Sequence, residues 1–569
     1  MPSLPWLHGG DLVAQQLKAF GTEYVFTLTG GHISPLYDGL RFVDVPLIDF
    51  RHEQAAVHAA DAYARVRRDV AVAAVTAGPG VTGAVTGVAN AYYAESPVIV
   101  LGGRNPFITD GAGNLQEAPH LELMRPITKY CTAAYDCWRS RDVLHDAFAT
   151  AQTPRLGPAF LDLPMDMQLT RVPLDAAPPV RTRPRRAVGG VDPDAMREVA
   201  ARLGTAAQPV VLVGSGAYWA RAEQSLHAFA CGLKAPVFAN GMARGILGAH
   251  HPFQVVSGRR EALRGADVVL MLGVDFDFRL GFGQPGVIHP GAFVVQVDPD
   301  ASRLGRNRDV DMGIASDIER FLTELVGLDS AYGRPTPPRW TANLLANDAA
   351  RRERRAHGAG TPGTVHPVDF TTQVADFLDE DATVIGDGGD IVAMFASRHR
   401  PGGPGLWMDP GPFGCLGVGA PFAIGARLHR RDTQVAVIFG DGSFGFNAFE
   451  FESAIRQDLP FVGVIGNDGA WGEMRTFHAD LFGEGDMSAQ YLSQDPAYEQ
   501  VVEALGGHGE RVDRAEDIKP ALERAFAAGV PAVVNVILDP TYRRENAAVS
   551  GKHVARSYGE GDPNAFKRP

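Results

Sequence analysis

Two aspartates stand where neighbouring apolar runs end, and their spacing suits the binding of a cation. Asp441 follows VAVIF within GDG, and Asp468 ends the run FVGVIGND. Because ligands of an open parallel sheet bind at the carboxyl ends of its strands, both carboxylates can reach one site. Gly440 and Gly442 allow a close backbone approach and place N–H groups at a helix start, which favours phosphate. Two carboxylates and a backbone carbonyl leave room for phosphate oxygens around Mg²⁺, so the spacing predicts a clamp for a metal-bound diphosphate.

Each aspartate also has an ordinary structural explanation, since Asp441 can be a turn residue and Asp468 a helix cap. The combination is more specific. GDG, then 24 residues, then Asn467-Asp468 resembles the thiamine diphosphate motif of the superfamily of acetolactate synthase, pyruvate decarboxylase and benzaldehyde lyase. The resemblance implies that Asp441 and Asp468 bind the metal through their side chains, and Ala470 through its carbonyl. Many members have Asn-Asn here, but the Asn-Asp form also occurs in the acetolactate synthase branch, so metal binding is expected to survive.

Glu53 is the residue that the resemblance assigns to activation of the cofactor. It follows the apolar run VPLIDF and opens a helical pattern, so it is expected at a strand-to-helix turn. A glutamate favoured by the helix macrodipole is the structural alternative. The resemblance implies that its carboxyl group hydrogen-bonds N1′ of the aminopyrimidine. Desolvation there would raise its pKa and let it hold a proton, which glutamine could not do.

Further cofactor contacts follow from two segments that resemble the family, TAGPGVTGAVTGVANAYY and DPGPFGCLGVGAPF. In the second segment, Gly414 would offer its carbonyl to the cofactor's 4′-amine and Leu416 would support its bent shape. Ordinary core packing is the alternative for Leu416. With Glu53, the implied cofactor contacts are Thr76, Gly78, Pro79, Asn90, Gly414, Leu416, Gly440, Asp441, Gly442, Ser443, Asp468, Ala470 and Trp471.

Three further residues are candidates for catalysis near the reacting carbon. His32, in TLTGGHISP, matches an active-site histidine of benzaldehyde lyase, although a histidine beside glycines can simply cap a turn. Gln116, followed by Glu117, matches a glutamine–glutamate segment of the family. Glu473 follows the metal loop, and an ionisable group there suits proton transfer. An exposed helical glutamate is the alternative.

The segment 541–569 is basic within an acidic chain, with three acids against six Lys or Arg: Arg543, Arg544, Lys552, Arg556, Lys567 and Arg568. Such a segment is commonly a solvated tail. It could instead close over the site and pair with the phosphates of a coenzyme A thioester. A lid of this kind is a feature of the oxalyl-CoA decarboxylase and 2-hydroxyacyl-CoA lyase branch. The resemblance then implies Arg543, Arg544, Lys552 and Arg556 as substrate contacts.

The predicted reaction is therefore a C–C lyase reaction that converts a 2-hydroxyacyl-CoA into formyl-CoA and an aldehyde or ketone. Two alternatives stay open. One is a carboligase or lyase similar to acetolactate synthase or benzaldehyde lyase, acting on 2-oxo acids or acyloins. The other is a catalytically silent protein that has kept the fold, which the presence of all three carboxylates disfavours.

Short apolar runs alternating with helical patterns must position these residues. Alternation of this kind predicts an α/β protein with three doubly wound parallel sheets. We expect a pyrimidine-binding domain over 1–175, a central Rossmann-like domain over 190–330, a diphosphate-binding domain over 366–540 and a tail over 541–569. Proline-rich segments over 164–193 and 328–366, expected to be irregular, separate the three domains.

Composition and charge exclude several other classes of protein. The 569 residues carry a formal charge of -13, which opposes nucleic-acid binding. No apolar run is long enough for a membrane span, and the N-terminus lacks a signal-peptide pattern, so we expect a cytoplasmic protein. The four cysteines form no CxxC pair, which predicts buried thiols and neither a disulfide framework nor a zinc site.

The central block gives little indication of a ligand. VVLVGSGAYWA offers Gly214 and Gly216 but has Trp219 in the place of the third glycine of a dinucleotide fingerprint, so a redox nucleotide site is weakly indicated. Relatives use this domain for FAD, for ADP or for nothing. The resemblance also implies a homodimer at least, with a tetramer common, because one subunit's diphosphate-binding domain faces another's pyrimidine-binding domain.

Overall fold

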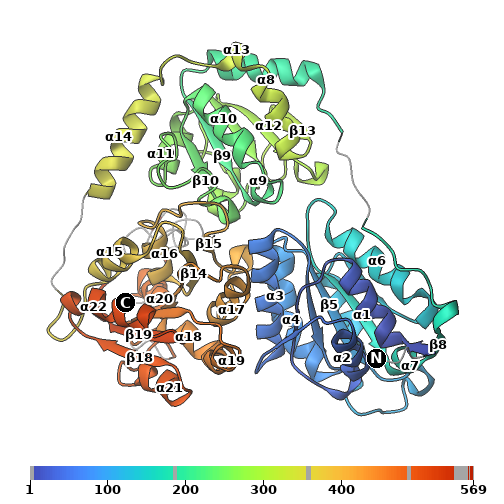
Figure 1. Cartoon of the computed structure of the whole chain (residues 1–569). Coiled ribbons are helices and arrows are strands. Elements are labelled where there is room, and N and C mark those ends of the chain that lie inside the picture. The colour runs from blue at the N-terminus through green and yellow to red at the C-terminus, as the bar shows by residue number, and fades with distance from the viewer. Residues whose placement is uncertain are drawn as a thin grey trace.

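The computed structural model describes residues 5–183, 189–353, 360–483, 489–543, 562 and 564–567. Three α/β domains lie at the corners of a triangle (Figure 1). Each contains one parallel sheet, and a separate antiparallel pair joins β1 (Trp6–His8) to β8 (Arg171–Pro173). None of the described helices is long and apolar enough to span a membrane.

The first domain contains a six-stranded sheet of order β3-β2-β4-β5-β7-β6. Its central strands are apolar and buried on both faces, as a sheet covered by helices on both sides requires. The strands are β2 (Val25–Thr27), β3 (Leu47–Asp49), β4 (Ala71–Val75), β5 (Val98–Arg104), β6 (Tyr130–Ala133) and β7 (Ala159–Pro164). The helices are α1 (Gly9–Ala19), α2 (Ser34–Phe42), α3 (Glu53–Arg67), α4 (Pro79–Tyr93), α5 (His120–Met124), α6 (Ser140–Ala151) and α7 (Met165–Leu169).

The central domain has a five-stranded sheet of order β10-β9-β11-β12-β13. Its strands are β9 (Pro209–Val213), β10 (Val237–Ala239), β11 (Val268–Leu272), β12 (Phe293–Asp298) and β13 (Met312–Ala315). Its helices are α8 (Pro193–Thr205), α9 (Ser215–Trp219), α10 (Glu223–Leu233), α11 (Arg259–Gly265), α12 (Ile318–Val326) and α13 (Asp329–Tyr332), followed by α14 (Arg339–Glu353). Gly214 and Gly216 both lie against Gly273, where a Cβ would come within 2.8 Å of its backbone, so both glycines serve the packing of this turn.

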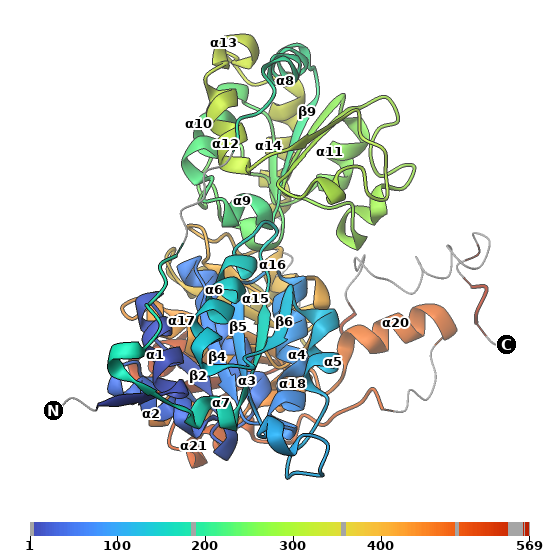
Figure 2. The ribbon, with the colours of Figure 1, turned by 90° about the vertical axis from the view of Figure 1, so that its right-hand side faces the viewer.

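The third domain has a six-stranded sheet of order β15-β14-β16-β17-β19-β18. The strands are β14 (Thr383–Asp387), β15 (Trp407–Met408), β16 (Val435–Gly440), β17 (Val462–Asn467), β18 (His508–Val512) and β19 (Ala532–Ile537). The helices are α15 (Pro367–Phe377), α16 (Asp390–Ala396), α17 (Gly419–His429), α18 (Asp441–Asn447), α19 (Glu450–Arg456), α20 (Gly472–Phe482), α21 (Tyr498–Ala504) and α22 (Ile518–Ala527). Figure 2 shows α20 projecting from the side of the molecule.

These sheets confirm the predicted fold class of three doubly wound parallel sheets. The prediction of irregular structure between the domains is partly wrong. The segment 328–366 contains the 15-residue helix α14, and the segment 164–193 contains α7 and β8. Prolines flank α14 but none lies within it, so they limit the helix without interrupting it.

The first and third domains of the chain pack through α3 and α17, which lie side by side (Figure 1). The contact is close, because a Cβ at Gly425 would clash with the carbonyl oxygen of Ala59. Arg65 is buried at this contact, where it pairs with Asp61 and donates to the carbonyl of Asp409 at 2.6 Å. A polar network therefore fixes the register of the two helices.

Candidate active site

The two predicted metal-binding aspartates lie at adjacent strand ends. Strands β16 and β17 pair in parallel up to Gly440 and Gly466, Asp441 begins α18, and Asp468 directly follows β17. Asp441 is only 2% exposed, and its Oδ2 is buried without a hydrogen-bond partner. Burial and the charge of Asp468 raise the pKa of Asp441 to about 7. Burial also raises the pKa of Asp468.

A buried, unpartnered carboxylate oxygen beside a second, half-buried carboxylate is costly unless a cation binds both groups. The donor set, two carboxylates and nearby backbone carbonyls, suits a hard divalent cation such as Mg²⁺. These residues therefore fit the metal that the spacing predicts.

Glycines shape the turns around the two aspartates. A Cβ at Gly442 would lie 2.5 Å from the indole of Trp471, so this ring packs directly on the GDG turn. A Cβ at Gly472 would lie 2.5 Å from Oδ2 of Asp468. The hydroxyl of Ser443, a predicted cofactor contact, instead donates to the carbonyl of Asp387 and to that of Gly440.

Gln494 fixes the loop that carries Ala470 through two hydrogen bonds. Its Nε2 donates to the carbonyls of Asn467 at 2.9 Å and of Leu538 at 2.8 Å. Ala470 forms a bridge with Tyr491 and is buried. Gln494 has no recognisable motif, so sequence reasoning missed it.

Glu53 is the first residue of α3, as predicted, and its side chain is 15% exposed. Its carboxylate lies against α4, where a Cβ at Gly83 would come within 2.6 Å of Oε2. On the strand-to-helix turn before α4, the hydroxyl of Thr76 is buried without a hydrogen-bond partner. Glu53 follows β3 and Thr76 follows β4, so both polar groups lie at the carboxyl edge of the first sheet.

A histidine–aspartate pair fixes the turn at Gly78 and Pro79. The N–H of Gly78 donates to Nε2 of His120 at 2.9 Å, so the proton of a neutral His120 ring lies on Nδ1, 2.8 Å from Asp162. Arg104 also pairs with Asp162, at 3.0 Å. Sequence reasoning missed His120 and Asp162, because 42 residues separate them and only the fold brings them together.

Gln116 lies against the same turn. Gly78 has a positive φ of 57°, and a Cβ there would lie 2.5 Å from the carbonyl oxygen of Gln116. The neighbouring Glu117 accepts hydrogen bonds from the backbone N–H groups of Gly113 and Asn114, which lowers its pKa. The glutamine–glutamate segment is therefore an ordered loop beside the turn that begins α4.

Asn105 links His32 to this loop. Because Nδ2 of Asn105 donates to the carbonyl of Leu115, its Oδ1 faces Nε2 of His32, at 2.9 Å. The proton of a neutral His32 ring is thus on Nε2. Its Nδ1 is buried without a hydrogen-bond partner and is left as an acceptor.

Asn90, a predicted cofactor contact, makes two hydrogen bonds within the chain. It is fully buried, its Nδ2 donates to Asp61 at 2.9 Å, and its Oδ1 accepts from the thiol of Cys415 at 3.2 Å. Burial raises the pKa of Cys415 to about 12. Asn90 therefore joins the polar network between the first and third domains of one chain. The prediction that the cysteines are buried holds for Cys137 alone, since the other three are half-buried.

Gly414 and Leu416 lie on the loop before α17. Gly414 has a φ of 68°, is exposed, and has nothing within 4 Å of where a Cβ would be. Leu416 is half-buried. Both residues are accessible to a molecule outside this chain.

Glu473 lies on the first turn of α20 and points back toward α16. A Cβ at Gly389 would clash with its Oε2. Two residues further on, Arg475 is buried and its Nη2 lies 3.2 Å from Oδ2 of Asp468. Sequence reasoning missed Arg475. Of the predicted substrate contacts, Arg543 is described, whereas Arg544, Lys552 and Arg556 lie outside the described residues.

Within one chain the two halves of the predicted site stay apart. Glu53 belongs to the first domain, and Asp441 and Asp468 belong to the third. Among the described residues, no hydrogen bond or ion pair joins Glu53 to either aspartate.

Family models match all three domains in order. The N-terminal TPP binding domain of thiamine pyrophosphate enzymes matches residues 7–123, the central domain matches 196–325, and the C-terminal TPP binding domain matches 387–536. The chain is 38% identical over 548 residues to a "Probable acetolactate synthase" of Mycobacterium bovis, covering 95% of this chain and 98% of the relative. It is 32% identical to 2-hydroxyacyl-CoA lyase 2 of Caenorhabditis elegans and of Homo sapiens, covering 95% of this chain and 91% of each relative.

The chain therefore belongs to the thiamine pyrophosphate enzyme family. It is a thiamine diphosphate-dependent enzyme, thiamine diphosphate being the same compound as thiamine pyrophosphate. Relatives with both names, synthase and lyase, span nearly its whole length.

Proposed function

We propose that the protein is a C–C lyase that cleaves a 2-hydroxyacyl-CoA into formyl-CoA and an aldehyde or ketone. The observation that carries this proposal is the place where the basic segment 541–569 begins. Strand β19 pairs with β17 so that Ile537 is level with Asn467, and the N–H of Leu538 donates to the carbonyl of Asn467 at 2.8 Å. The chain thus leaves the sheet beside Asp468.

Arg543 is the described cation of this segment. Burial lowers the pKa of Arg475, an effect that the charge of Asp468 opposes and the positive charge of Arg543 reinforces. Arg475 in turn contacts Asp468. Cations at this edge are suited to pair with the phosphates of a coenzyme A thioester.

When bound, thiamine diphosphate supplies a carbon nucleophile and accommodates the electron pair left by C–C cleavage. Asp441, Asp468 and the carbonyl of Ala470 would hold Mg²⁺ against its diphosphate. Glu53 would hold the proton at N1′ of the aminopyrimidine. These roles need only groups that the fold places at the two sheet edges.

Two further residues would handle the protons of the substrate. Nδ1 of His32, a buried acceptor, would take the proton of the 2-hydroxyl group whose carbon becomes the carbonyl of the released aldehyde or ketone. The carboxyl group of Glu473 would deliver a proton to the carbon that leaves as the formyl group. Gln116 would help to orient the substrate from its loop.

The complete site would form between two copies of the chain. Glu53 has no described contact with the aspartates, and Gly414 is open to the outside. The face around it carries exposed aromatic side chains, including Tyr93 and Phe413, which stack with ring centroids 5.3 Å apart. An exposed patch of this kind is typical of a protein interface. A dimer or larger oligomer in light scattering would support this arrangement, and a monomer that is fully active would contradict it.

Condensation of 2-oxo acids is the second candidate function, because the relatives of 38% identity are named acetolactate synthases. One experiment separates the two. Purified protein with thiamine diphosphate and Mg²⁺ is given a series of 2-hydroxyacyl-CoA thioesters or pyruvate, and products are identified by mass.

Formyl-CoA from a thioester, absent in Glu53→Gln, is the expected result. Turnover of pyruvate to acetolactate without formyl-CoA would favour the second function. No formyl-CoA from any thioester would contradict the proposed one.

A further inference from the structure

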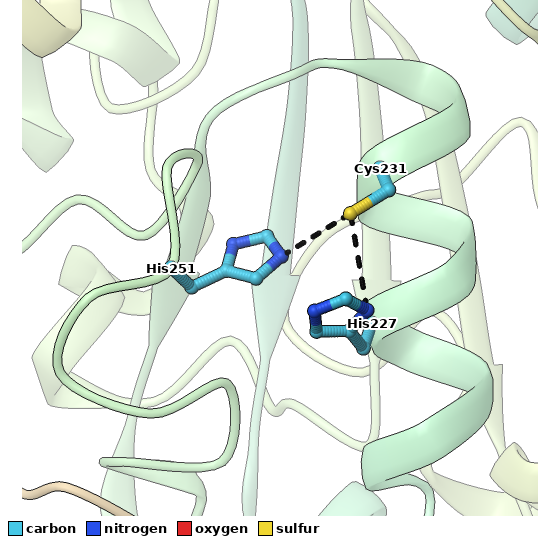
Figure 3. Close-up of side chains that lie close together, drawn as sticks. All are labelled: His227, Cys231 and His251. Carbon is cyan, nitrogen blue, oxygen red and sulfur yellow. Dashed lines mark hydrogen bonds between the residues drawn. The ribbon is translucent and has the colours of Figure 1, made fainter.

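Three potential metal ligands meet in the central domain, away from the active site. His227 and Cys231 lie one turn apart on α10, and His251 reaches them from the loop after Gly248 (Figure 3). The sulfur of Cys231 lies 3.8 Å from Nδ1 of His227 and 3.8 Å from Nε2 of His251. All three donor atoms lie within 4.8 Å of one another.

The two sulfur–nitrogen distances are close to the distances between donor atoms around a bound metal ion. Residues four apart on a helix face the same side, so His227 and Cys231 can share one ion. With Zn–S of about 2.3 Å and Zn–N of about 2.0–2.1 Å, a tetrahedral site places sulfur and nitrogen roughly 3.6 Å apart. The observed 3.8 Å needs only a small adjustment of the side chains.

The ligand types favour zinc over the magnesium of the active site. One thiolate and two imidazoles are ligands for zinc-like ions, whereas Mg²⁺ prefers oxygen. His251 is only 7% exposed, so its ring is held away from solvent beside the other two donors. We propose that His227, Cys231 and His251 bind one zinc-class divalent cation.

The fourth position of the proposed site has room for a water molecule. His227 also lines a cavity of about 410 Å³ between the central and third domains, together with Glu223, Gln224, Ile246 and the segment 402–404. Water can therefore reach the ion from this side, as in sites that have three protein ligands and one solvent ligand.

The N–H of Phe253 donates to Nδ1 of His251 at 3.3 Å, so without a metal the ring's proton is on Nε2 and faces the sulfur. A simple hydrogen-bonded cluster is therefore the competing explanation. Metal binding moves this proton to Nδ1, ends the long bond to Phe253 and releases the thiol proton, one proton for each ion bound. A weak hydrogen bond is exchanged for three metal–ligand bonds.

The ion would tie α10 to the loop between β10 and α11, which packs against the third domain. In that loop Gly245 lies against the carbonyl of Gly403, and the carbonyl of Ala249 accepts from Nη1 of Arg400 at 3.1 Å. His251 lies two residues after Ala249. Metal binding at His251 would therefore stiffen the contact between the two domains.

The test uses the full chain saturated with thiamine diphosphate and Mg²⁺, titrated with Co²⁺ as a coloured substitute for Zn²⁺. A thiolate ligand gives a charge-transfer absorption that a carboxylate site does not, so binding at Asp441 or Asp468 is silent. We expect this absorption to saturate at one ion per chain and to disappear in Cys231→Ser. Zn²⁺ affinity, measured by competition with a chromophoric chelator, should fall more than about 100-fold in His227→Gln and in His251→Gln, more than outer-shell losses cause.

His250 supplies the matched control, because it is the exposed neighbour of His251 and is not part of the cluster. His250→Gln should keep the absorption and the affinity. His227 is also exposed, so its replacement should leave the fold intact, as thermal unfolding would check. The proposal is overturned if no thiolate absorption appears, if it persists in Cys231→Ser, or if His227→Gln and His250→Gln bind Zn²⁺ equally well.

Discussion

At the scale of single residues, three carboxylates of the candidate site each rest against a glycine. Glu53 lies against Gly83, Asp468 against Gly472, and Glu473 against Gly389. In each case a Cβ would come within 2.6 Å of a carboxylate oxygen, closer than any real contact. These glycines therefore set the positions of the carboxylates as much as the carboxylates' own helices do.

Gly83→Ala should reduce activity while leaving the fold stable. The new methyl group displaces the carboxylate of Glu53, and a shift of about 1 Å at a catalytic group can cost about 100-fold in rate. Replacing glycine within a helix otherwise favours stability by about 0.5–1 kcal/mol. The measurements are kcat with the best substrate and the midpoint of thermal unfolding.

Gly189→Ala is the control, because a Cβ there meets nothing within 4 Å. It should leave kcat unchanged. Equal activity of Gly83→Ala and wild type would show that the contact with Glu53 has no catalytic importance.

Candidate site residues within a recognisable sequence motif could be predicted, whereas those brought to the site only by folding could not. Glu53, Asp441 and Asp468 stand at strand ends, and their assignment to the cofactor and the metal comes from the resemblance of their motifs to the family. Arg475 and Gln494 belong to no recognisable motif. Each is identified only by its contact with the segment that contains Asn467 and Asp468. The cluster of His227, Cys231 and His251 has no recognisable motif, since only the fold brings His251 to α10.

At the scale of elements, a buried carboxylate links β14 to the start of α17. Asp387 accepts hydrogen bonds from the N–H groups of Gly417 at 3.0 Å and Gly419 at 2.7 Å. Burial, partly offset by these bonds, raises its pKa to about 7. Its side chain thus holds the loop that carries Gly414 and Leu416.

This pKa predicts a specific pH dependence of stability. Between pH of about 4, the pKa of the unfolded group, and about 7, the folded state binds a proton that the unfolded state has released. The free energy of unfolding should therefore decrease as pH rises through this window, by at most about 1.4 kcal/mol per pH unit from this group.

Denaturant unfolding of wild type and Asp387→Asn at several pH values measures the effect. The amide side chain of this variant cannot titrate, so the difference in unfolding free energy between the two proteins should change with pH in this window and be constant above it. Parallel curves over the whole range would show that Asp387 does not titrate as its burial implies.

Strands and helices with a clear hydrophobic pattern could be predicted from the sequence. Those that form only because of a neighbouring segment could not. Ten strands coincide with short apolar runs of the sequence: β2, β4, β5, β9, β11, β12, β14, β16, β17 and β19. Helix α14 was missed because the prolines before it suggested irregular structure. Short edge strands such as β13 and β15 are set by pairing with a neighbour rather than by their own pattern.

At the scale of the whole molecule, the contact of α3 with α17 decides how the first and third domains are joined. Arg65 is 1% exposed and pairs with Asp61 through two hydrogen bonds of 2.8 and 2.7 Å. Arg65→Ala would leave the buried carboxylate of Asp61 with the hydrogen bond from Asn90 but without its counter-charge, which costs about 3–5 kcal/mol. Thermal unfolding should show a clear loss of stability.

Arg41→Ala is the matched control, because Arg41 is 86% exposed in its own ion pair with Asp38. An exposed pair of this kind contributes about 0–1 kcal/mol. Similar midpoints for Arg65→Ala and Arg41→Ala would contradict the importance assigned to the buried pair.

The arrangement of the domains was beyond prediction from residue patterns alone. Asn90 illustrates this, because its expected cofactor role depended on alignment, whereas its environment is set by Asp61 and Cys415 from two domains. The division between Glu53 and the aspartates is likewise a property of the whole chain, and it underlies the proposal that two copies complete each site.

If Asp441 and Asp468 hold a metal-bound diphosphate, cofactor binding must depend on both the metal and these carboxylates. Thiamine diphosphate is titrated calorimetrically into the full protein, with and without Mg²⁺, and Asp441→Asn is the matched variant. One cofactor should bind per chain only when Mg²⁺ is present, with no measurable binding to correctly folded Asp441→Asn. Equal affinity without Mg²⁺, or in the variant, would contradict it.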